Sequence, residues 1–131
     1  MKKQIEAVKE FHETFNQENG VQPRLLTEEE FSLRYNLMSE ENKEYFMACE
    51  NQDLTEIADA LGDKLYILCG TILKHGMQDI IEKVFDEIHR SNMSKVGDDG
   101  KAIMREDGKI LKGPNYFKPN LKQFVEEYEE K

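Results

Sequence analysis

Residues 54–74 carry the apolar pattern that most constrains the fold of this chain. Apolar side chains recur there every three or four residues, which is the period of an α-helix and not of a strand. The stripe consists of Leu54, Ile57, Ala58, Leu61, Leu65, Leu68 and Ile72. Glu56, Asp59 and Asp63 fall within about 60° of one another on the opposite side of the same helix. The acidic line continues into Tyr66, Ile67 and Gly70, so the segment predicts a long helix that packs on two sides, with these acids at the mouth of a buried seam.

The preceding segment is predicted to pair with this helix as a hairpin. Thr27 and Glu30 have the spacing of a capping box, and a second helix is expected to run from there to about Cys49. Its core-facing stripe is expected to contain Leu33, Leu37, Tyr45 and Ala48. Residues 50–53 form a short polar connection that ends in a capping Asp53. The second and third helices should therefore be antiparallel neighbours.

Helical periods also occur at both ends of the chain. Residues 3–16 predict a first helix, which is followed by a loop at Gly20 and Pro23. Residues 80–88 carry a fourth apolar period. These elements indicate an all-α fold of four to five helices.

The C-terminal part of the chain has a different pattern. Two apolar triplets, at 102–104 and 109–111, flank a turn at residues 105–108, which predicts a small β-hairpin. Asn120 is expected to cap a last short helix that runs through Tyr128. A single domain over residues 1–131 is expected, because the chain has about the length of one domain.

Charge is distributed unevenly along the sequence. The formal net charge is −9, which disfavours binding to a nucleic-acid backbone. Residues 90–122 contain eight Lys or Arg against four Asp or Glu, so this segment is +4 and the remainder −13. An acidic body with a basic segment suits a metal ion together with a polyphosphate.

Cysteine content and hydropathy bear on the cellular compartment. Cys49 and Cys69 lie in apolar helical context and match no metal motif or disulfide framework, so both are expected to be buried, reduced thiols. No segment approaches the roughly 20 apolar residues of a membrane span. These features favour a cytoplasmic protein with no membrane partner.

Two acidic pairs with i, i+3 spacing lie on the facing helices. Glu41 and Glu44 fall on the core-facing side of the second helix, while Glu56 and Asp59 lie on the acidic side of the third. Carboxylates that converge between packed helices repel one another and lose hydration, so a cation is expected among them. Oxygen donors suit Mg²⁺, with Mn²⁺ as a substitute.

Simpler interpretations of these acids stay open. Glu56 has capping-box spacing from Asp53, and Glu40 and Glu44 can be ordinary surface acids. Asp63 can pair with Lys64 or Lys74 outside any site.

The sequence resembles a known superfamily over nearly its whole length. The strings EENKEY and DLTEIADALGDKLYILCGTILKHG, followed by HRSNMSK and DGKAIMREDGKILKGPNYFKPNL, resemble MazG and the phosphoribosyl-ATP pyrophosphohydrolase-like branch of the all-α nucleotide pyrophosphohydrolases. The superfamily hallmark ExxE followed by ExxD corresponds to Glu41, Glu44, Glu56 and Asp59. The resemblance implies a MazG-like helical bundle that assembles as a homodimer or homotetramer.

The resemblance also implies roles for individual residues. The four hallmark acids would be metal ligands, and Asn92 and Lys95 would contact phosphate. Asp63 falls where relatives place a nucleotide-contacting side chain. The implied activity is Mg²⁺-dependent hydrolysis of a nucleoside triphosphate to the monophosphate and pyrophosphate.

Charge and side-chain chemistry add further candidates to this list. Glu41 is the candidate general base, with Glu44 as a second catalytic carboxylate. Arg90 or Lys112 would assist Lys95 with the triphosphate, and Tyr116 would stack on the base unless it only packs locally. SNMSK can instead simply end the fourth helix.

Two other functions remain possible for such a chain. One is hydrolysis of phosphoribosyl-ATP in histidine biosynthesis, which the same metal chemistry would serve. The other is a catalytically silent helical module that acts in oligomerisation or regulation, although the intact set of four acids argues against it.

Overall fold

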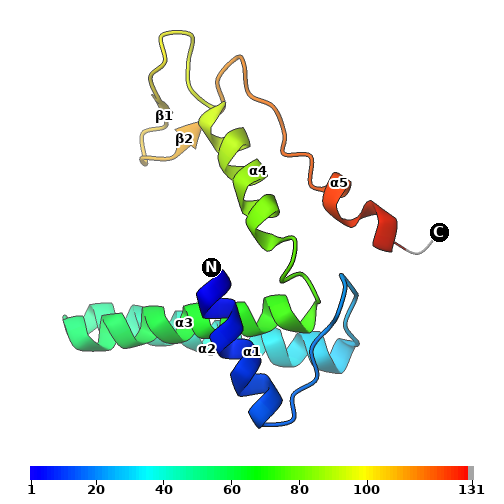
Figure 1. Ribbon diagram of the computed structural model, residues 1–131. Coiled ribbons are helices and arrows are strands. Elements are labelled where there is room, and N and C mark those ends of the chain that lie inside the picture. Colours follow the sequence, from blue (N-terminus) through cyan, green and yellow to red (C-terminus); the bar gives the residue numbers. More distant parts are fainter. Residues whose placement is uncertain (130–131) are drawn as a thin grey trace. The chain divides into compact units, whose positions relative to one another are not determined.

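Five α-helices and one two-stranded hairpin make up the regular structure of residues 1–129, the part of the chain that the computed structural model describes (Figure 1). The order is α1 (Lys2–Thr14), α2 (Glu28–Glu50), α3 (Leu54–Lys74), α4 (Ile81–Met93), β1 (Ile103–Met104), β2 (Ile110–Leu111) and α5 (Lys122–Val125), with a 3-10 turn at Glu126–Tyr128. The predicted all-α class with a small hairpin is confirmed. Within residues 1–129, no helix has the length and apolar character needed to cross a membrane.

The chain divides into two compact units, Met1–Asp79 and Ile80–Lys131. The first unit contains α1 to α3, and the second contains α4, the hairpin and α5. This division leaves the expectation of a single domain over residues 1–131 as a prediction.

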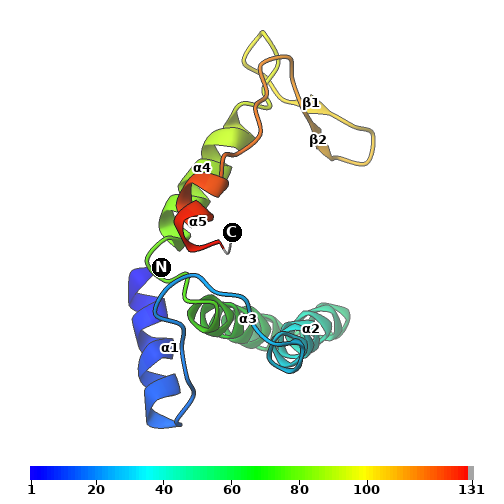
Figure 2. The same ribbon diagram turned by 90° about the vertical axis from the view of Figure 1, so that its right-hand side faces the viewer.

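Side-chain caps define the starts of the two long helices in the first unit. The Thr27 hydroxyl accepts the Glu30 backbone N–H at 3.2 Å, and the Glu30 carboxylate accepts the Thr27 backbone N–H at 3.1 Å. The Asp53 carboxylate accepts the Glu56 backbone N–H at 3.1 Å. Both predicted caps are confirmed. They leave a very short turn, in which Gln52 takes a positive φ of 53°, so that α3 returns alongside α2 (Figures 1 and 2).

α2 packs against the acidic side of α3 and not against its leucine stripe. Arg34 of α2 bonds to Ile67 and Thr71, and Ala48 and Ala60 are both buried. The leucines of the predicted α3 stripe stay 39–82% exposed in the chain, and these are Leu54, Leu61, Leu65 and Leu68. The predicted core-facing stripe of α2 is likewise wrong at two of its positions, Leu33 and Tyr45, which are exposed.

Helix α1 covers the C-terminal half of α3 on the side away from α2 (Figure 2). Phe11 of α1 meets the edge of the Tyr66 ring at a centroid distance of 5.6 Å. Ile5 and Val8 are buried, as are Ile72 and Leu73 of α3. The main hydrophobic core of the first unit therefore lies at this crossing.

A buried arginine links all three helices of this unit. Arg34 is 8% exposed, and its guanidinium donates to the Thr71 hydroxyl at 3.1 Å and to the Ile67 carbonyl at 3.0 Å. A methyl group on Gly70 would lie 2.7 Å from this guanidinium and 3.2 Å from the buried His12 ring. Burial, above all, lowers the pKa of His12 from its usual value. Gly70 thus lets a guanidinium and an imidazole pack directly on the α3 backbone.

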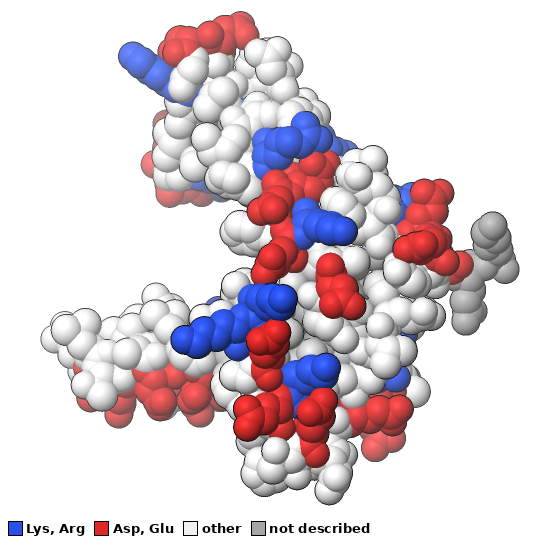
Figure 3. All heavy atoms as spheres, in the orientation of Figure 1, with Lys and Arg blue, Asp and Glu red and all other residues white. Residues whose placement is uncertain are grey.

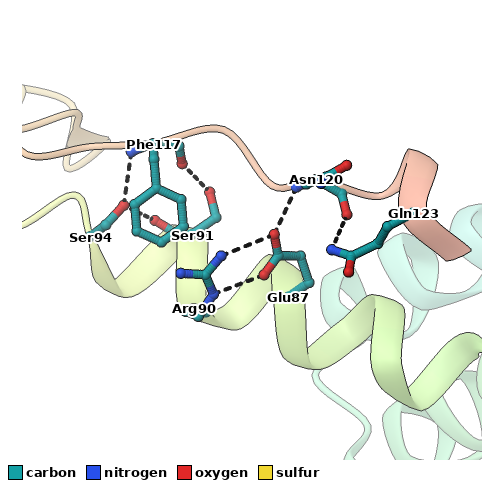
Figure 4. A network of polar contacts seen from close by, with 7 residues as sticks. All are labelled: Glu87, Arg90, Ser91, Ser94, Phe117, Asn120 and Gln123. Carbon is teal, nitrogen blue, oxygen red and sulfur yellow. Dashed lines mark hydrogen bonds and ion pairs between the residues drawn. The ribbon is translucent and has the colours of Figure 1, made fainter.

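In the second unit, the amphipathic helix α4 has its polar side covered by its own chain. Glu87 and Ser91 are buried beneath the segment 117–120, whereas Phe85 on the apolar side is 67% exposed (Figure 4). Asn120 does not cap α5 with its side chain, so that prediction is wrong. Its backbone N–H instead donates to Glu87 at 2.7 Å.

The two cysteines differ in burial. Cys69 is fully buried on α3, as predicted, but Cys49 is exposed near the end of α2, which corrects the expectation for that residue. Both are free thiols.

The two glycines of α3 provide a matched test of this packing. Gly70→Ala is expected to lower the free energy of unfolding by about 1–3 kcal/mol, because the added methyl group overpacks Arg34 and His12. Gly62→Ala is expected to raise it by up to about 1 kcal/mol, since nothing lies within 4 Å of the added methyl group and alanine favours the helix. Urea unfolding monitored by circular dichroism measures both changes. A change of the same sign in the free energy of unfolding of the two variants would contradict the packing described for Arg34.

Candidate functional site

The antiparallel pairing of α2 and α3 brings acidic side chains from both helices together. Glu41 and Glu44 lie one turn apart on α2, and Asp63 approaches them from α3. One carboxylate oxygen from each of the three lies within 4.8 Å of the other two. A single cation can therefore contact all three side chains.

Glu41 experiences the strongest effect of this convergence. It is partly buried, and its Oε2 atom is shielded from solvent and has no hydrogen-bond partner among the described residues. Burial raises the pKa of Glu41, and the nearby Glu44 carboxyl raises it further, followed by the charges of Asp63 and Asp59. The protein thus holds a carboxylate oxygen in a place where a negative charge without a partner is energetically unfavourable.

No basic side chain of the first unit forms an ion pair with these acids. The ion pairs recorded for residues 1–129 involve none of the clustered carboxylates. Lys64, the sequence neighbour of Asp63, donates instead to the Asn42 side chain at 2.9 Å. Lys74 donates to the Glu18 carbonyl at 2.7 Å, so neither lysine considered for Asp63 pairs with it in the structure.

A pocket of about 300 Å³ opens beside the cluster, between the same two helices. Three of its lining residues are acidic, namely Glu44, Glu56 and Asp59. The remaining walls are uncharged and come from Met47, Ala48, Asn51 and Ala60. Acidic side chains line one edge of the α2–α3 hairpin in the space-filling view (Figure 3). Glu44 belongs to both the cluster and the pocket, so the two form one continuous site.

The four hallmark acids thus lie in one region, although not as a single compact set. Glu41 and Glu44 cluster with Asp63, while Glu56 and Asp59 line the pocket with Glu44. The backbone of Glu56 takes part in the Asp53 cap while its side chain lines the pocket, so the structural and the functional interpretation of this residue are compatible.

Sequence reasoning missed the uncharged lining residues Met47 and Asn51. The sequence contained a pattern that could have indicated them. They follow Glu44 by three and seven residues, a spacing that places all three on one face of a helix.

The donor set of the site suits a hard divalent cation. All the charged groups of the site are carboxylates, and neither histidine nor cysteine belongs to it. One carboxylate oxygen, Oε2 of Glu41, is buried without a hydrogen-bond partner among the described residues. Glu41, Glu44, Glu56, Asp59 and Asp63 are the residues able to hold such an ion.

The basic candidates all lie in the second unit. Arg90 already forms a two-bond ion pair with Glu87, at 2.8 and 3.2 Å, and its guanidinium carbon lies 4.3 Å from the centre of the Phe117 ring (Figure 4). Lys112 places its ammonium 4.8 Å from the centre of the Tyr116 ring. Arg90 is therefore committed to structural contacts, whereas Lys112 has no carboxylate partner in the described part of the chain.

Close backbone contact places Lys95 beside the segment that follows the hairpin. A methyl group on Gly113 would lie 2.2 Å from the Val96 carbonyl oxygen and 2.7 Å from that of Lys95. Asn92 is exposed at the end of α4, and its carbonyl accepts the Lys95 backbone N–H at 3.2 Å. The segments that carry Lys95 and Lys112 therefore run side by side.

Comparison with known proteins assigns the family. Residues 8–92 match the model of the phosphoribosyl-ATP pyrophosphohydrolase family, and this range contains all five acids of the site. The chain belongs to that family. It is accordingly a nucleotide pyrophosphohydrolase, and the predicted family and enzyme class are confirmed.

The other comparisons add little to this assignment. No curated protein matches the sequence significantly. The crystal structure of a candidate NTP pyrophosphohydrolase from Exiguobacterium sp. 255-15 shares 23% sequence identity and covers 95% of this chain and 93% of its own, with a TM-score of 0.33. That structural similarity is low, so membership of the phosphoribosyl-ATP pyrophosphohydrolase family rests on the sequence match.

The contacts of Glu87 lead to a test in the second unit of the enzyme. Glu87→Ala is expected to speed amide hydrogen exchange at Asn120 and its neighbours, because the Asn120 N–H loses its acceptor. Asp86→Ala, at an exposed position on the same helix, is the control and should leave these rates unchanged. Hydrogen exchange followed by mass spectrometry or NMR measures both. Equal protection of Asn120 in the two variants would show that Glu87 does not hold this segment.

Proposed function

We propose that the enzyme is a Mg²⁺-dependent nucleoside triphosphate pyrophosphohydrolase, which converts an NTP or dNTP to the monophosphate and pyrophosphate. The observation that carries this proposal is the buried, unpartnered oxygen of Glu41, which lies among further carboxylates that form no ion pair with a basic side chain of the first unit. Such an arrangement is electrostatically unfavourable by itself and becomes favourable around a divalent cation.

The proposed ligands of Mg²⁺, or of Mn²⁺ in its place, are Glu41, Glu44, Glu56 and Asp59. The geometry supports adding Asp63 to this set, in place of the nucleotide contact first expected for it. When bound, the ion supplies Lewis-acid neutralisation of the phosphate charge and lowers the pKa of a bound water.

The protein side chains have separate proposed roles. Glu41 accepts a proton from the attacking water, and Glu44 orients that water from the adjacent turn. Asn92, Lys95 and Lys112 are the proposed phosphate contacts, and Tyr116 is a proposed base contact. Arg90 is the weakest of the substrate-binding candidates, because Glu87 already pairs with it.

A second substrate is favoured by one finding. The matching family model is that of phosphoribosyl-ATP pyrophosphohydrolase, so phosphoribosyl-ATP belongs in any substrate panel. The idea of a catalytically silent module has weaker support, because the acids of the site are all present and converge.

The exposed apolar surface of α3 supports the proposal of a homodimer or homotetramer. Leu61, Leu65 and Leu68 form one stripe and are each 39–51% exposed in the chain. A second copy is the proposed cover for this stripe. A cytoplasmic location is part of the same proposal and is supported by the two free thiols.

Pyrophosphate release tests the activity directly. With Mg²⁺ the enzyme should release pyrophosphate, and not single phosphate, from at least one member of a panel of NTPs, dNTPs and phosphoribosyl-ATP, and EDTA should abolish it. Glu44→Gln and Asp59→Asn should each reduce turnover about 100-fold or more and weaken Mn²⁺ binding in calorimetry, because each removes an anionic ligand.

Glu40→Gln is the matched control for this experiment. Glu40 is exposed on the same helix as Glu44 but lies outside the cluster and the pocket, so the variant should keep wild-type turnover. Full Mg²⁺-dependent turnover in both Glu44→Gln and Asp59→Asn would refute the proposed site.

The oligomer is tested by mass in solution. Sedimentation equilibrium should give two or four times the 15.4 kDa of the chain, and Leu65→Glu should shift the mass towards that of the monomer because it places a charge in the proposed interface. Val21→Glu changes an 89% exposed loop residue and should leave the mass unchanged. A wild-type chain that sediments as a monomer would contradict the interface.

A further inference from the structure

The uncharged part of the pocket has no role in the chemistry proposed so far. Met47 of α2 and Asn51, the residue that caps the end of this helix, lie one helical turn apart and line the same pocket as Glu44, Glu56 and Asp59. Ala48 and Ala60, each 3% exposed, complete this part of the lining with small side chains. The pocket therefore has an anionic portion and an uncharged portion within about 300 Å³.

The two portions suit different parts of a nucleotide. The anionic portion repels phosphate except through a cation, so it suits the metal-bound triphosphate. The uncharged portion offers a polarizable thioether and aliphatic carbons, which favour the face of a ring. A volume of this size lies at the low end for small-molecule sites and accommodates part of a nucleotide, not all of it.

Asn51 is available to read polar groups on such a ring. Its backbone N–H is used at the end of α2, where it donates to the Met47 carbonyl at 2.9 Å. Its side-chain amide forms no hydrogen bond to another described residue. The end of the helix thus holds the backbone in place, and the amide keeps one acceptor and two donors for a ligand.

We propose that Asn51 and Met47 contact the nucleobase and that Asn51 thereby sets the base preference of the enzyme. This inference rests on the proposed function, because it assigns the uncharged part of the pocket to the substrate of that same site. An amide distinguishes bases through the pattern of donors and acceptors on their edges, while the thioether packs on a ring of any base.

Selectivity among nucleotides is the readout that separates base recognition from a structural role. We would measure kcat/KM for ATP, GTP, CTP and UTP and their deoxy forms, together with dissociation constants by calorimetry with Ca²⁺ in place of Mg²⁺. Asn51→Ala should lower kcat/KM for the preferred nucleotide about tenfold and leave the least preferred nearly unchanged. Asn51→Asp keeps an acceptor and loses the donors, so it should change the order of preference.

The controls use the same residue type and the same pocket. Asn36→Ala, at an exposed asparagine on α2 outside the pocket, should leave every ratio unchanged. Met47→Ala should weaken the binding of all the nucleotides to a similar degree, because the proposed contact of Met47 is with the face of the base ring.

The possible outcomes distinguish this inference from the proposed function. The base contact would be overturned if both Asn51 variants kept the wild-type ratios of kcat/KM between nucleotides, or if Asn51→Ala lowered kcat/KM equally for all of them. Either result would count even if the enzyme releases pyrophosphate normally. Altered binding ratios in Ca²⁺ without any pyrophosphate release in Mg²⁺ would support the base contact and refute the proposed activity. A wild-type enzyme that binds none of these nucleotides would overturn the inference.

Discussion

The antiparallel packing of α2 on α3 is the interaction on which the candidate site depends. Two side-chain caps and a very short turn define where the two helices begin and how the chain reverses between them. The buried pair Ala48 and Ala60 allows the helices to approach closely near that turn. Farther along the hairpin, this register brings Glu41 opposite Asp63. A shift of one residue in either helix would separate the carboxylates.

The candidate site brings like charges together within the α2–α3 hairpin. Carboxylates from two helices share a narrow region, and the raised pKa of Glu41 reflects both lost hydration and repulsion from neighbouring acids. Nearby, Arg34 is buried with neutral partners and does not reach these acids. The acids form no ion pair with a basic side chain of the first unit, and this is the basis for the cation proposed at the site.

The second unit uses a different principle. Helix α4 buries hydrogen-bonding groups beneath the segment that follows the hairpin, and Glu87 is the centre of that network. This network makes Arg90 a poor candidate for binding phosphate, because its charge already balances that of Glu87. It leaves Lys95 and Lys112 as basic groups on adjacent segments without recorded carboxylate partners in the described chain.

The sequence by itself determined the features that depend on neighbours within a few residues. Helix periods, the Thr27 and Asp53 caps, the small hairpin and the i, i+3 spacing of the acids are local, and all could be read before the structure. The sequence also predicted that acids of the two helices meet, because Glu41 and Glu44 share the core-facing side of their helix. Only the tertiary structure decided which acid of α3 completes the cluster, because periodicity gives the side of a helix on which a residue lies but not the register between two helices. That register brought Asp63 to Glu41, placed Asn51 in the pocket and left Leu65 exposed.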